Sequence, residues 1–188
     1  MREKIALFGG TFDPVHNGHL DLVEKAKVEC DLDRVILIPC AQSPFKTGSK
    51  TTADAEERFQ MLKNAIAERG WEDWAEASRL EIDRPPPSFS WETAEHYRNF
   101  FPDAELFWIL GTDQWDSIER WAEPEKLRNL LKFIVVTRND TLVQDRPKWQ
   151  EISIRFEHPA SSTAIREGGA DNGWIPESNQ PLVSEIYS

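Results

Sequence analysis

Two adjacent glycines and a His-x-Gly-His group lie within residues 8–19, at a spacing that suits the binding of a phosphate. The stretch reads Phe-Gly-Gly-Thr-Phe-Asp-Pro-Val-His-Asn-Gly-His. An apolar run at 5–8 leads into it and predicts a buried strand, and a helix-period stretch follows at 20–28. Such a strand-to-helix crossing presents backbone N–H groups and a helix N-terminus to a phosphate. His16 and His19 are three residues apart, so both can lie on one side of the first helical turn.

Simpler interpretations of this stretch stay open. A Gly-Gly pair before a helix is often only a tight turn, and two histidines three residues apart also occur in metal sites. The chain has no second pair of ligands with zinc spacing, and it lacks the G-x-G-x-x-G pattern of dinucleotide oxidoreductases. The full twelve-residue string is far more specific than either feature alone, which favours a phosphate site.

The elements that must position this stretch alternate between strand-like runs and helical patterns, which is typical of a parallel α/β sheet. The expected strands are 5–8, 34–39, 80–82, 105–110, 133–137 and a shorter one at 152–156. The expected helices are 19–29, 53–68, 90–100, 162–168 and 179–187, with Ser90 a candidate cap of the third. A short helical region is expected at 115–121 and an exposed charged segment at 139–150. We therefore predict a single domain over residues 1–188, with a Rossmann-like, doubly wound parallel sheet of about five strands and helices on both faces.

The charge balance limits the classes of partner. The chain has 22 basic and 33 acidic residues and a net charge of −11. This argues against nucleic acid or an anionic membrane as a partner, because phosphate groups need Lys and Arg to neutralise them. A phosphorylated ligand must therefore meet a local positive site.

The composition also indicates the cellular compartment of the protein. No apolar run is long enough to span a membrane, no signal peptide pattern is present, and Cys30 and Cys40 form no disulfide framework. These features predict a cytoplasmic protein. They leave the oligomeric state open, a homo-oligomer included.

Three further stretches follow expected strands, at the edge where open α/β sheets bind ligands. Lys46 lies in a polar loop after the second strand, from which it can reach a phosphate at the first, although a lone lysine is more often a solvated charge. Residues 111–113, Gly-Thr-Asp, follow the strand at 105–110 and could equally be a turn with a helix cap. Residues 161–166 combine hydroxyls, helix N–H groups and Arg166, which together suit a triphosphate. The simpler alternative there is an N-cap followed by a surface arginine.

The string at 8–19 resembles the signature of the HxGH nucleotidyltransferases, which bind ATP there and attach its AMP to a phosphorylated partner. Residues 161–166 resemble the second signature of that family, Ser-x-Thr-x-Ile-Arg. Further likeness at 57–62, 87–93 and 136–138 extends over nearly the whole chain and points to the bacterial nicotinate-nucleotide adenylyltransferases. The loop at 87–93 departs from the family's Ser-Tyr-Thr-x-x-Thr pattern, because prolines replace the usual glycine, Phe89 the tyrosine and Ser90 the threonine.

The resemblance implies a set of site residues and a direct in-line transfer without a protein nucleophile, with Mg²⁺ carried by ATP and no metal held by the protein. The implied catalytic residues are His16, His19, Lys46 and Arg166. The implied ATP contacts are Gly9, Gly10, Thr11, Phe12, His16, Gly18, His19, Gly111, Asp113, Arg138, Ser162, Thr163, Ile165 and Arg166. The implied contacts to a pyridine mononucleotide are Thr11, Lys46, Ser88, Phe89, Ser90, Thr93, Trp115 and Trp121, where an aromatic ring can stack on the pyridine.

Two other functions stay open at this point. One is an HxGH transferase with another acceptor, such as nicotinamide mononucleotide or phosphopantetheine, against which the loop at 88–93 and Trp121 argue. The other is a nucleotide-binding module without turnover, against which the intact His16, His19, Lys46 and Arg166 argue. His158, which precedes Pro159 just ahead of the expected helix at 162–168, is expected to be structural. The two cysteines are also expected to be packing residues, because nothing marks their thiols as activated.

Overall fold

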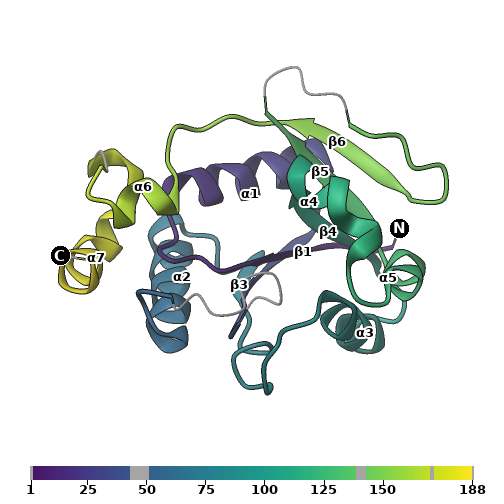
Figure 1. The fold of residues 1–188 in the computed structure, drawn as a ribbon, viewed down its shortest axis with the longest axis horizontal. Helices are drawn as coiled ribbons and strands as arrows, with labels where there is room; N and C mark the ends of the chain where they lie inside the picture. The colour runs from purple at the N-terminus through teal and green to yellow at the C-terminus, as the bar shows by residue number, and fades with distance from the viewer. Residues whose placement is uncertain (1, 43–50, 139–142, 170–171, 188) are drawn as a thin grey trace.

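The computed structural model describes residues 2–42, 51–138, 143–169 and 172–187, and Figure 1 shows their arrangement. Its centre is one sheet whose strands pair in parallel, in the order β3-β2-β1-β4-β5-β6. The strands are β1 Lys4–Gly10, β2 Arg34–Pro39, β3 Ala75–Ala77, β4 Glu105–Gly111, β5 Lys132–Thr137 and β6 Glu151–Arg155. The predicted α/β class is confirmed, with six strands in place of about five.

The strand-to-strand connections carry the helices. These are α1 Asn17–Glu29, α2 Ala55–Arg69, α3 Ser90–Phe100, α4 Thr112–Ser117, α5 Pro124–Leu130, α6 Ser162–Arg166 and α7 Gln180–Ile186, with short 3-10 turns η1 Ile118–Arg120, η2 Asn172–Trp174 and η3 Glu177–Asn179. Helix α2 is bounded at both ends by residues whose chemistry starts or stops a helix. Asp54 and Glu57 form a capping box at its start, and Gly70 ends it in the left-handed region with a φ of 64°.

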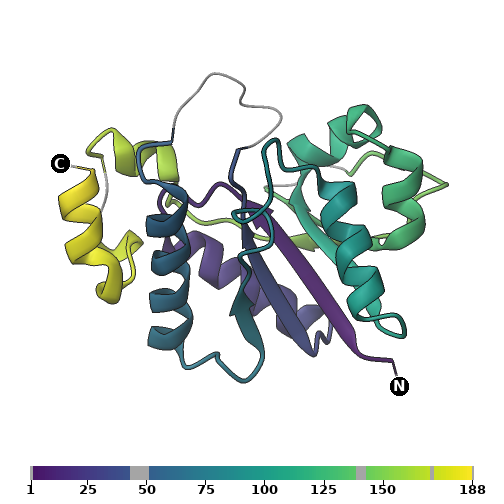
Figure 2. The ribbon, with the colours of Figure 1, turned by 90° about the horizontal axis from the view of Figure 1, so that it is seen from below.

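Helices cover both faces of the sheet, as Figures 1 and 2 show. Alternate residues of β1 point to opposite cores. Ala6 and Phe8 pack with α1, α2, α6 and α7, whereas Ile5 and Leu7 pack with α3, α4 and α5. Both faces of the central strands are therefore buried, which is why their sequences read as continuous apolar runs. None of the helices in the described residues is long and apolar enough to cross a membrane.

The third strand differs from the prediction. The structure places it at Ala75–Ala77, paired with β2, whereas 80–82 lies in a turn. In that turn Asp83 N donates to Arg79 O at 2.9 Å, and the Arg79 and Asp83 side chains form an ion pair. The alternation of Leu80 and Ile82 about Glu81 resembles a strand locally, but the turn that follows β3 prevents it from joining the sheet.

Two smaller expectations are also corrected. Phe89, not Ser90, occupies the N-cap of α3, so that Ser90 is the first helical residue. The segment at 139–150 is not uniformly exposed where it is described, because Arg146 and Trp149 are buried. Trp149 packs edge-on against Trp115, with ring centroids 5.8 Å apart, and so belongs to one of the two cores.

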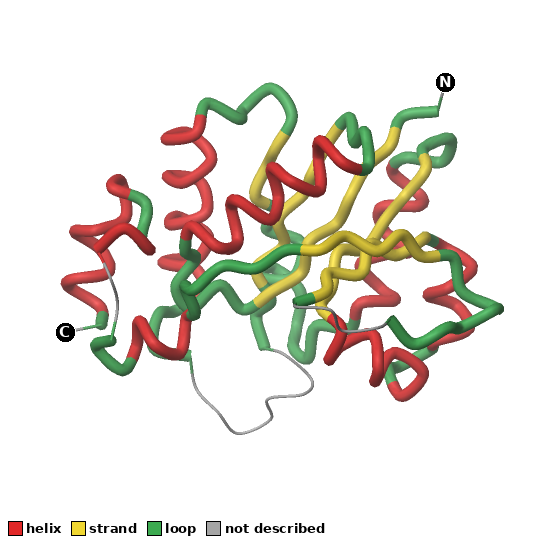
Figure 3. Tube along the Cα trace, turned by 90° about the horizontal axis from the view of Figure 1, so that it is seen from above, coloured by secondary structure: helices red, strands yellow, loops and turns green. Residues whose placement is uncertain are grey.

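The strand order sets the place of a ligand. From β1 the chain moves outward to β2 and β3, and it then returns to add β4 on the other side of β1. The sheet therefore changes its winding direction between β1 and β4. In open parallel sheets, ligands bind at the carboxyl ends of the strands at this point. Figure 3 shows the strands of the sheet continuing into loops, with helices on either side.

Candidate active site

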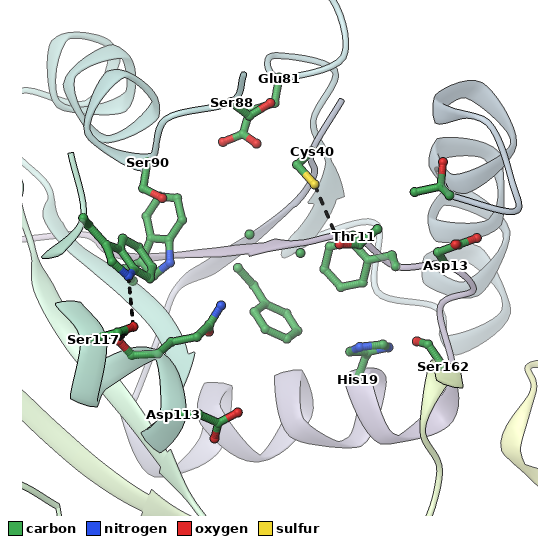
Figure 4. A pocket seen from close by; sticks show the side chains of 18 of the residues that line it. Thr11, Asp13, His19, Cys40, Glu81, Ser88, Ser90, Asp113, Ser117 and Ser162 are labelled. Atoms are coloured by element: carbon green, nitrogen blue, oxygen red, sulfur yellow. Dashed lines mark hydrogen bonds between the residues drawn. The ribbon is translucent and has the colours of Figure 1, made fainter. Parts of the chain in front are cut away.

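A cleft of about 1280 Å³ lies at the carboxyl ends of β1 and β4, and Figure 4 shows its side chains. Many of the residues predicted from sequence line it together. These are Gly9, Gly10, Thr11, Phe12, His19, Ser88, Ser90, Asp113, Trp121, Ser162, Thr163 and Arg166. In Figure 4, Thr11, Asp13, His19 and Ser162 lie on one side, and Asp113, Ser117 and Ser90 on the other. The two signatures thus meet at one site although they lie far apart in sequence.

Close packing explains the first glycine of the signature. A Cβ on Gly9 would lie 2.8 Å from Cζ2 of Trp108 in β4, which is too close for any side chain. Gly9 therefore lets the Trp108 ring lie against the end of β1, where both residues line the cleft. Gly10 is equally restricted, because its Cβ would lie 2.9 Å from Cζ of Phe12.

Phe12 holds an unusual backbone conformation at the turn after β1. Its φ is 51°, in the left-handed region that costs a non-glycine residue about 1–3 kcal/mol. Its ring is buried, edge-on to Phe8 at 5.4 Å and to His19 at 5.1 Å between centroids. The aromatic packing thus fixes the turn and places the His19 ring.

His19 offers the cleft one N–H donor. Its Nδ1 accepts from the backbone N–H of His16 at 3.3 Å, so the proton of the neutral ring lies on Nε2. Burial lowers the pKa of His19 well below its ordinary value, and His16 lowers it further. At neutral pH His19 is therefore an uncharged hydrogen-bond donor rather than a cation.

His16 lies beneath His19. The two rings are stacked with centroids 3.7 Å apart, and His16 is buried and does not line the cleft. Its pKa falls to about 4 because burial opposes the charged form, with smaller effects of His158 and Arg138. Its Nδ1 has no hydrogen-bond partner among the described residues. The direct ligand contact implied for His16 stays a prediction, and what the structure gives is support for His19.

Gly18 separates two histidine rings. A Cβ there would lie 3.0 Å from Nδ1 of both His16 and His158. His158 accepts from Ala160 N at 3.0 Å and faces Asp21 at 3.5 Å, so it is held in place as a structural residue, as expected. Gly18 is itself buried and lies behind the cleft.

The second signature packs directly against the first. Ser161 caps α6 by accepting from Ala164 N at 3.1 Å. Ser162 Oγ donates to Pro14 O at 2.9 Å, and Arg166 donates to Asp13 O at 2.6 Å. Ile165 is 4% exposed and anchors α6 in the core, so its side chain supports the site without facing it.

The loop at 88–93 contributes unevenly. Ser88 and Ser90 line the cleft, while Thr93 is fully buried and its hydroxyl donates to the Glu81 carboxylate at 2.6 Å. Contrary to the prediction of a mononucleotide contact, the Thr93 side chain therefore does not face the cleft but holds the buried Glu81 carboxylate. Phe89, half-buried, caps α3.

The two tryptophans that follow β4 have different places. Trp115 is fully buried, its Nε1 donates to Gln144 O at 2.9 Å, and its ring packs on Phe133. The structure thus corrects the prediction that its side chain can face a mononucleotide. Trp121 lines the cleft beside Ser117, with its Nε1 3.4 Å from Ser117 Oγ (Figure 4).

Two other predicted residues, Gly111 and Arg138, are not among those that line the cleft. Gly111 ends β4 and leads into α4, which carries Asp113. Arg138 lies in a separate hollow of about 390 Å³ with Glu157 and His158. Lys46 falls outside the described residues, and its role stays a prediction.

Sequence reasoning missed several residues of the cleft. These are Phe8, Asp13, Cys40, Thr51, Glu81, Trp108, Gln114, Ser117 and Arg120. Of these, Asp13 and Phe8 are part of the motif string itself, and Arg120 directly precedes Trp121, so a sequence signal existed for them. Glu81 had none, because its neighbours resembled a strand. It is 4% exposed, and burial raises the pKa of its carboxyl.

Among the described residues, the cleft contains no cluster suited to a bound metal. Within residues 2–42, 51–138, 143–169 and 172–187, no three His, Cys, Asp or Glu side chains lie close enough together to hold an ion. The positive groups that line the cleft there are Arg120 and Arg166.

Comparison with known proteins places the chain in a family. The model of the cytidylyltransferase-like family matches residues 7–168. A probable nicotinate-nucleotide adenylyltransferase of Methylacidiphilum infernorum is 36% identical, over 87% of this chain and 79% of that protein. A protein of Thermus thermophilus with the same description is 36% identical over 97% of each chain. The chain belongs to the cytidylyltransferase-like family, and within it to the nicotinate-nucleotide adenylyltransferases.

Solved structures agree with this adenylyltransferase fold. The Plasmodium falciparum nicotinic acid mononucleotide adenylyltransferase complexed with NaAD superposes with a TM-score of 0.74. The match covers 98% of this chain and 94% of that one, at 17% sequence identity. The two proteins thus share the arrangement of strands and helices although most of their residues differ.

Proposed function

We propose that this protein transfers AMP from ATP to nicotinate mononucleotide, giving nicotinate adenine dinucleotide and pyrophosphate. The observation that carries the proposal is the meeting of His19, Thr163 and Arg166 in one cleft at the change of winding between β1 and β4. In this proposal the 188 residues act as one catalytic domain. We also propose a cytoplasmic location, where the thiols of the two buried cysteines would stay reduced.

The reaction we propose is a direct displacement at phosphorus. An oxygen of the mononucleotide 5′-phosphate attacks the α-phosphorus of ATP, the new P–O–P bond forms, and the bond to the bridging oxygen of the β-phosphate breaks. Pyrophosphate leaves with the electron pair. No protein nucleophile is needed, so catalysis consists of positioning and of stabilising charge. Mg²⁺ enters with ATP as part of the substrate and neutralises the triphosphate.

The roles of the protein groups follow from their chemistry. Neutral His19 donates from Nε2 to a phosphate oxygen as negative charge shifts during transfer. Arg166 supplies a fixed positive charge, and we propose that Lys46 supplies another. Because the chain carries a net charge of −11, these local cations must overcome a repulsive overall field.

The mononucleotide is proposed to lie on the side of the cleft formed by Ser88, Ser90 and Trp121. The Trp121 indole can stack on the pyridine ring. Backbone N–H groups near 88–93 can donate to the nicotinate carboxylate, and they would lose that acceptor when facing an amide N–H₂, at about 1–3 kcal/mol. We therefore expect kcat/KM to favour nicotinate over nicotinamide mononucleotide by about 5–150-fold.

The test is an acceptor screen. The protein is incubated with ATP, Mg²⁺ and, separately, nicotinate mononucleotide, nicotinamide mononucleotide or phosphopantetheine, and products are identified by mass. The expected product is nicotinate adenine dinucleotide, formed with equimolar pyrophosphate. Faster turnover of the amide would overturn the acceptor while leaving adenylyl transfer intact. Absence of pyrophosphate release with every acceptor would leave only a nucleotide-binding module.

A further inference from the structure

Asp13, in the turn of the first signature, is joined by hydrogen bonds to segments from distant parts of the chain. We propose that Tyr187, which follows α7, is a positioning residue that holds this turn in its ligand-binding shape through the Asp13 carboxylate. The inference deepens the proposed function and rests on it. It assigns a role in ATP binding to a segment that does not line the cleft.

The Asp13 carboxylate is buried, at 5% exposure, and both of its oxygens accept hydrogen bonds. Oδ1 accepts from the Tyr187 hydroxyl at 2.6 Å and from Ala53 N at 3.0 Å, while Oδ2 accepts from Thr52 N at 2.9 Å. A buried carboxylate beside an anion site needs such donors, because both burial and the ligand disfavour its charge. Tyr187 is the only side chain among the three donors.

Donors from other elements also bind the backbone carbonyls of the same turn. The guanidinium of Arg58, a residue that is 1% exposed, donates to Thr11 O at 2.7 Å. Arg166 donates to Asp13 O and Ser162 to Pro14 O. These carbonyl oxygens are thereby paired with donors, which limits their repulsion of a phosphate. The turn that they hold contains Phe12 with its positive φ, a conformation that persists only where surrounding contacts fix it.

The Tyr187 hydroxyl is suited to this role because it remains a donor. Burial and the adjacent Asp13 carboxylate raise the pKa of Tyr187 far above its ordinary value. The segment that carries it is anchored to α2, because Asn179 is fully buried and its side chain donates to Met61 O at 2.8 Å. Figures 1 and 2 show α7 beside α2, on the same side of the molecule as α6.

The test compares two tyrosines with equally short bonds. Tyr187→Phe removes the donor to Asp13, while Tyr97→Phe removes a 2.6 Å bond to Ser78 in a residue that does not line the cleft. For Tyr187→Phe we expect the Kd for ATP, measured by calorimetry without acceptor, to rise about ten-fold, with the KM for the mononucleotide unchanged. For Tyr97→Phe we expect the Kd for ATP and the KM for the mononucleotide to keep their wild-type values. The fall in Tm should be similar in the two variants, because each loses one short hydrogen bond.

A double-mutant cycle with Asp13→Asn tests whether the effect passes through the carboxylate. In Asp13→Asn an N–H group would face the donor of Thr52 or Tyr187, so this change alone should weaken ATP binding at least as much as Tyr187→Phe does. Adding Tyr187→Phe to Asp13→Asn should raise the Kd for ATP only a little further. An unchanged ATP affinity in Tyr187→Phe, or fully additive losses in the cycle, would overturn the proposal. A wild-type protein that binds ATP but turns over no mononucleotide would instead count against the proposed function alone.

Discussion

His19 combines the properties of a donor to a reacting phosphate. Its tautomer is fixed by the His16 backbone, its ring is held by Phe12, and its lowered pKa keeps it neutral. We expect His19→Ala to reduce kcat by about 10²–10³-fold, the typical loss for one transition-state donor, with the fold kept. Pyrophosphate release and thermal unfolding measure the two effects. His96→Ala, at an exposed position in α3, is the control and should retain wild-type turnover.

Glu81 is a buried acid that the fold disfavours in its charged form. Its pKa is raised chiefly by burial, and the Thr93 hydroxyl and Arg84 offset only part of this effect. Above the ordinary pKa of 4.5, ionisation therefore costs more in the folded than in the unfolded chain, and below it both states are protonated.

The prediction is that Glu81→Gln raises the free energy of unfolding at pH 7.5, because the amide oxygen can still accept from Thr93. The gain should shrink as the pH falls toward 4.5. Urea unfolding at both pH values measures it. Glu72→Gln, at an exposed position, should change neither value. A loss of stability at pH 7.5 would mean that the charged form supports the fold.

At the scale of elements, the packing of β1 against β4 depends on the lack of a side chain at Gly9. In Gly9→Ala the new Cβ would meet the Trp108 ring at 2.8 Å, so the ring or the strand must shift. We expect a loss of about 1–3 kcal/mol in the free energy of unfolding, as for other overpacked cores. Because Trp108 lines the cleft, activity should fall as well. Gly169→Ala, whose Cβ would meet its nearest atom at an ordinary 3.5 Å, should change stability by less than about 0.5 kcal/mol.

At the scale of the whole molecule, the buried histidines link stability to pH. Both His16 and His19 have lowered pKa values, to about 4 for His16, whereas their ordinary value is 6.5. Between pH 4 and 6.5 these two histidines therefore bind more protons in the unfolded chain than in the folded one, so their contribution to stability falls as the pH falls. Each such proton contributes a slope of up to about 1.4 kcal/mol per pH unit.

We expect His16→Gln to reduce this slope between pH 4 and 6.5, measured by urea unfolding across the range, whatever its effect on absolute stability. His96→Gln should leave the slope at its wild-type value. An unchanged slope in His16→Gln would show that the pKa of His16 is not lowered in the folded protein, which would contradict the account of two neutral, stacked histidines.

Local sequence determined the elements and the motif that they carry. The runs at 5–8, 34–39, 105–110 and 133–137 became central strands, because strands buried on both faces need apolar residues at every position. Helix α2 forms over Ala55–Arg69, close to the predicted 53–68, because Asp54 caps its start and Gly70 ends it in the left-handed region. The string at 8–19 predicted two histidines at the first turn of the helix that follows β1, and the structure places His19 there, in α1, where it lines the cleft.

Tertiary structure alone decided which side chains face the cleft. Trp115 and Trp121 are six positions apart, yet one is fully buried in the core and the other lines the cleft. Glu81 became part of the site only because β3 ends before it. Asp13 and Tyr187 meet across 174 positions of sequence. No local period records such contacts, since they depend on how separately formed elements pack, and packing is a property of the assembled chain.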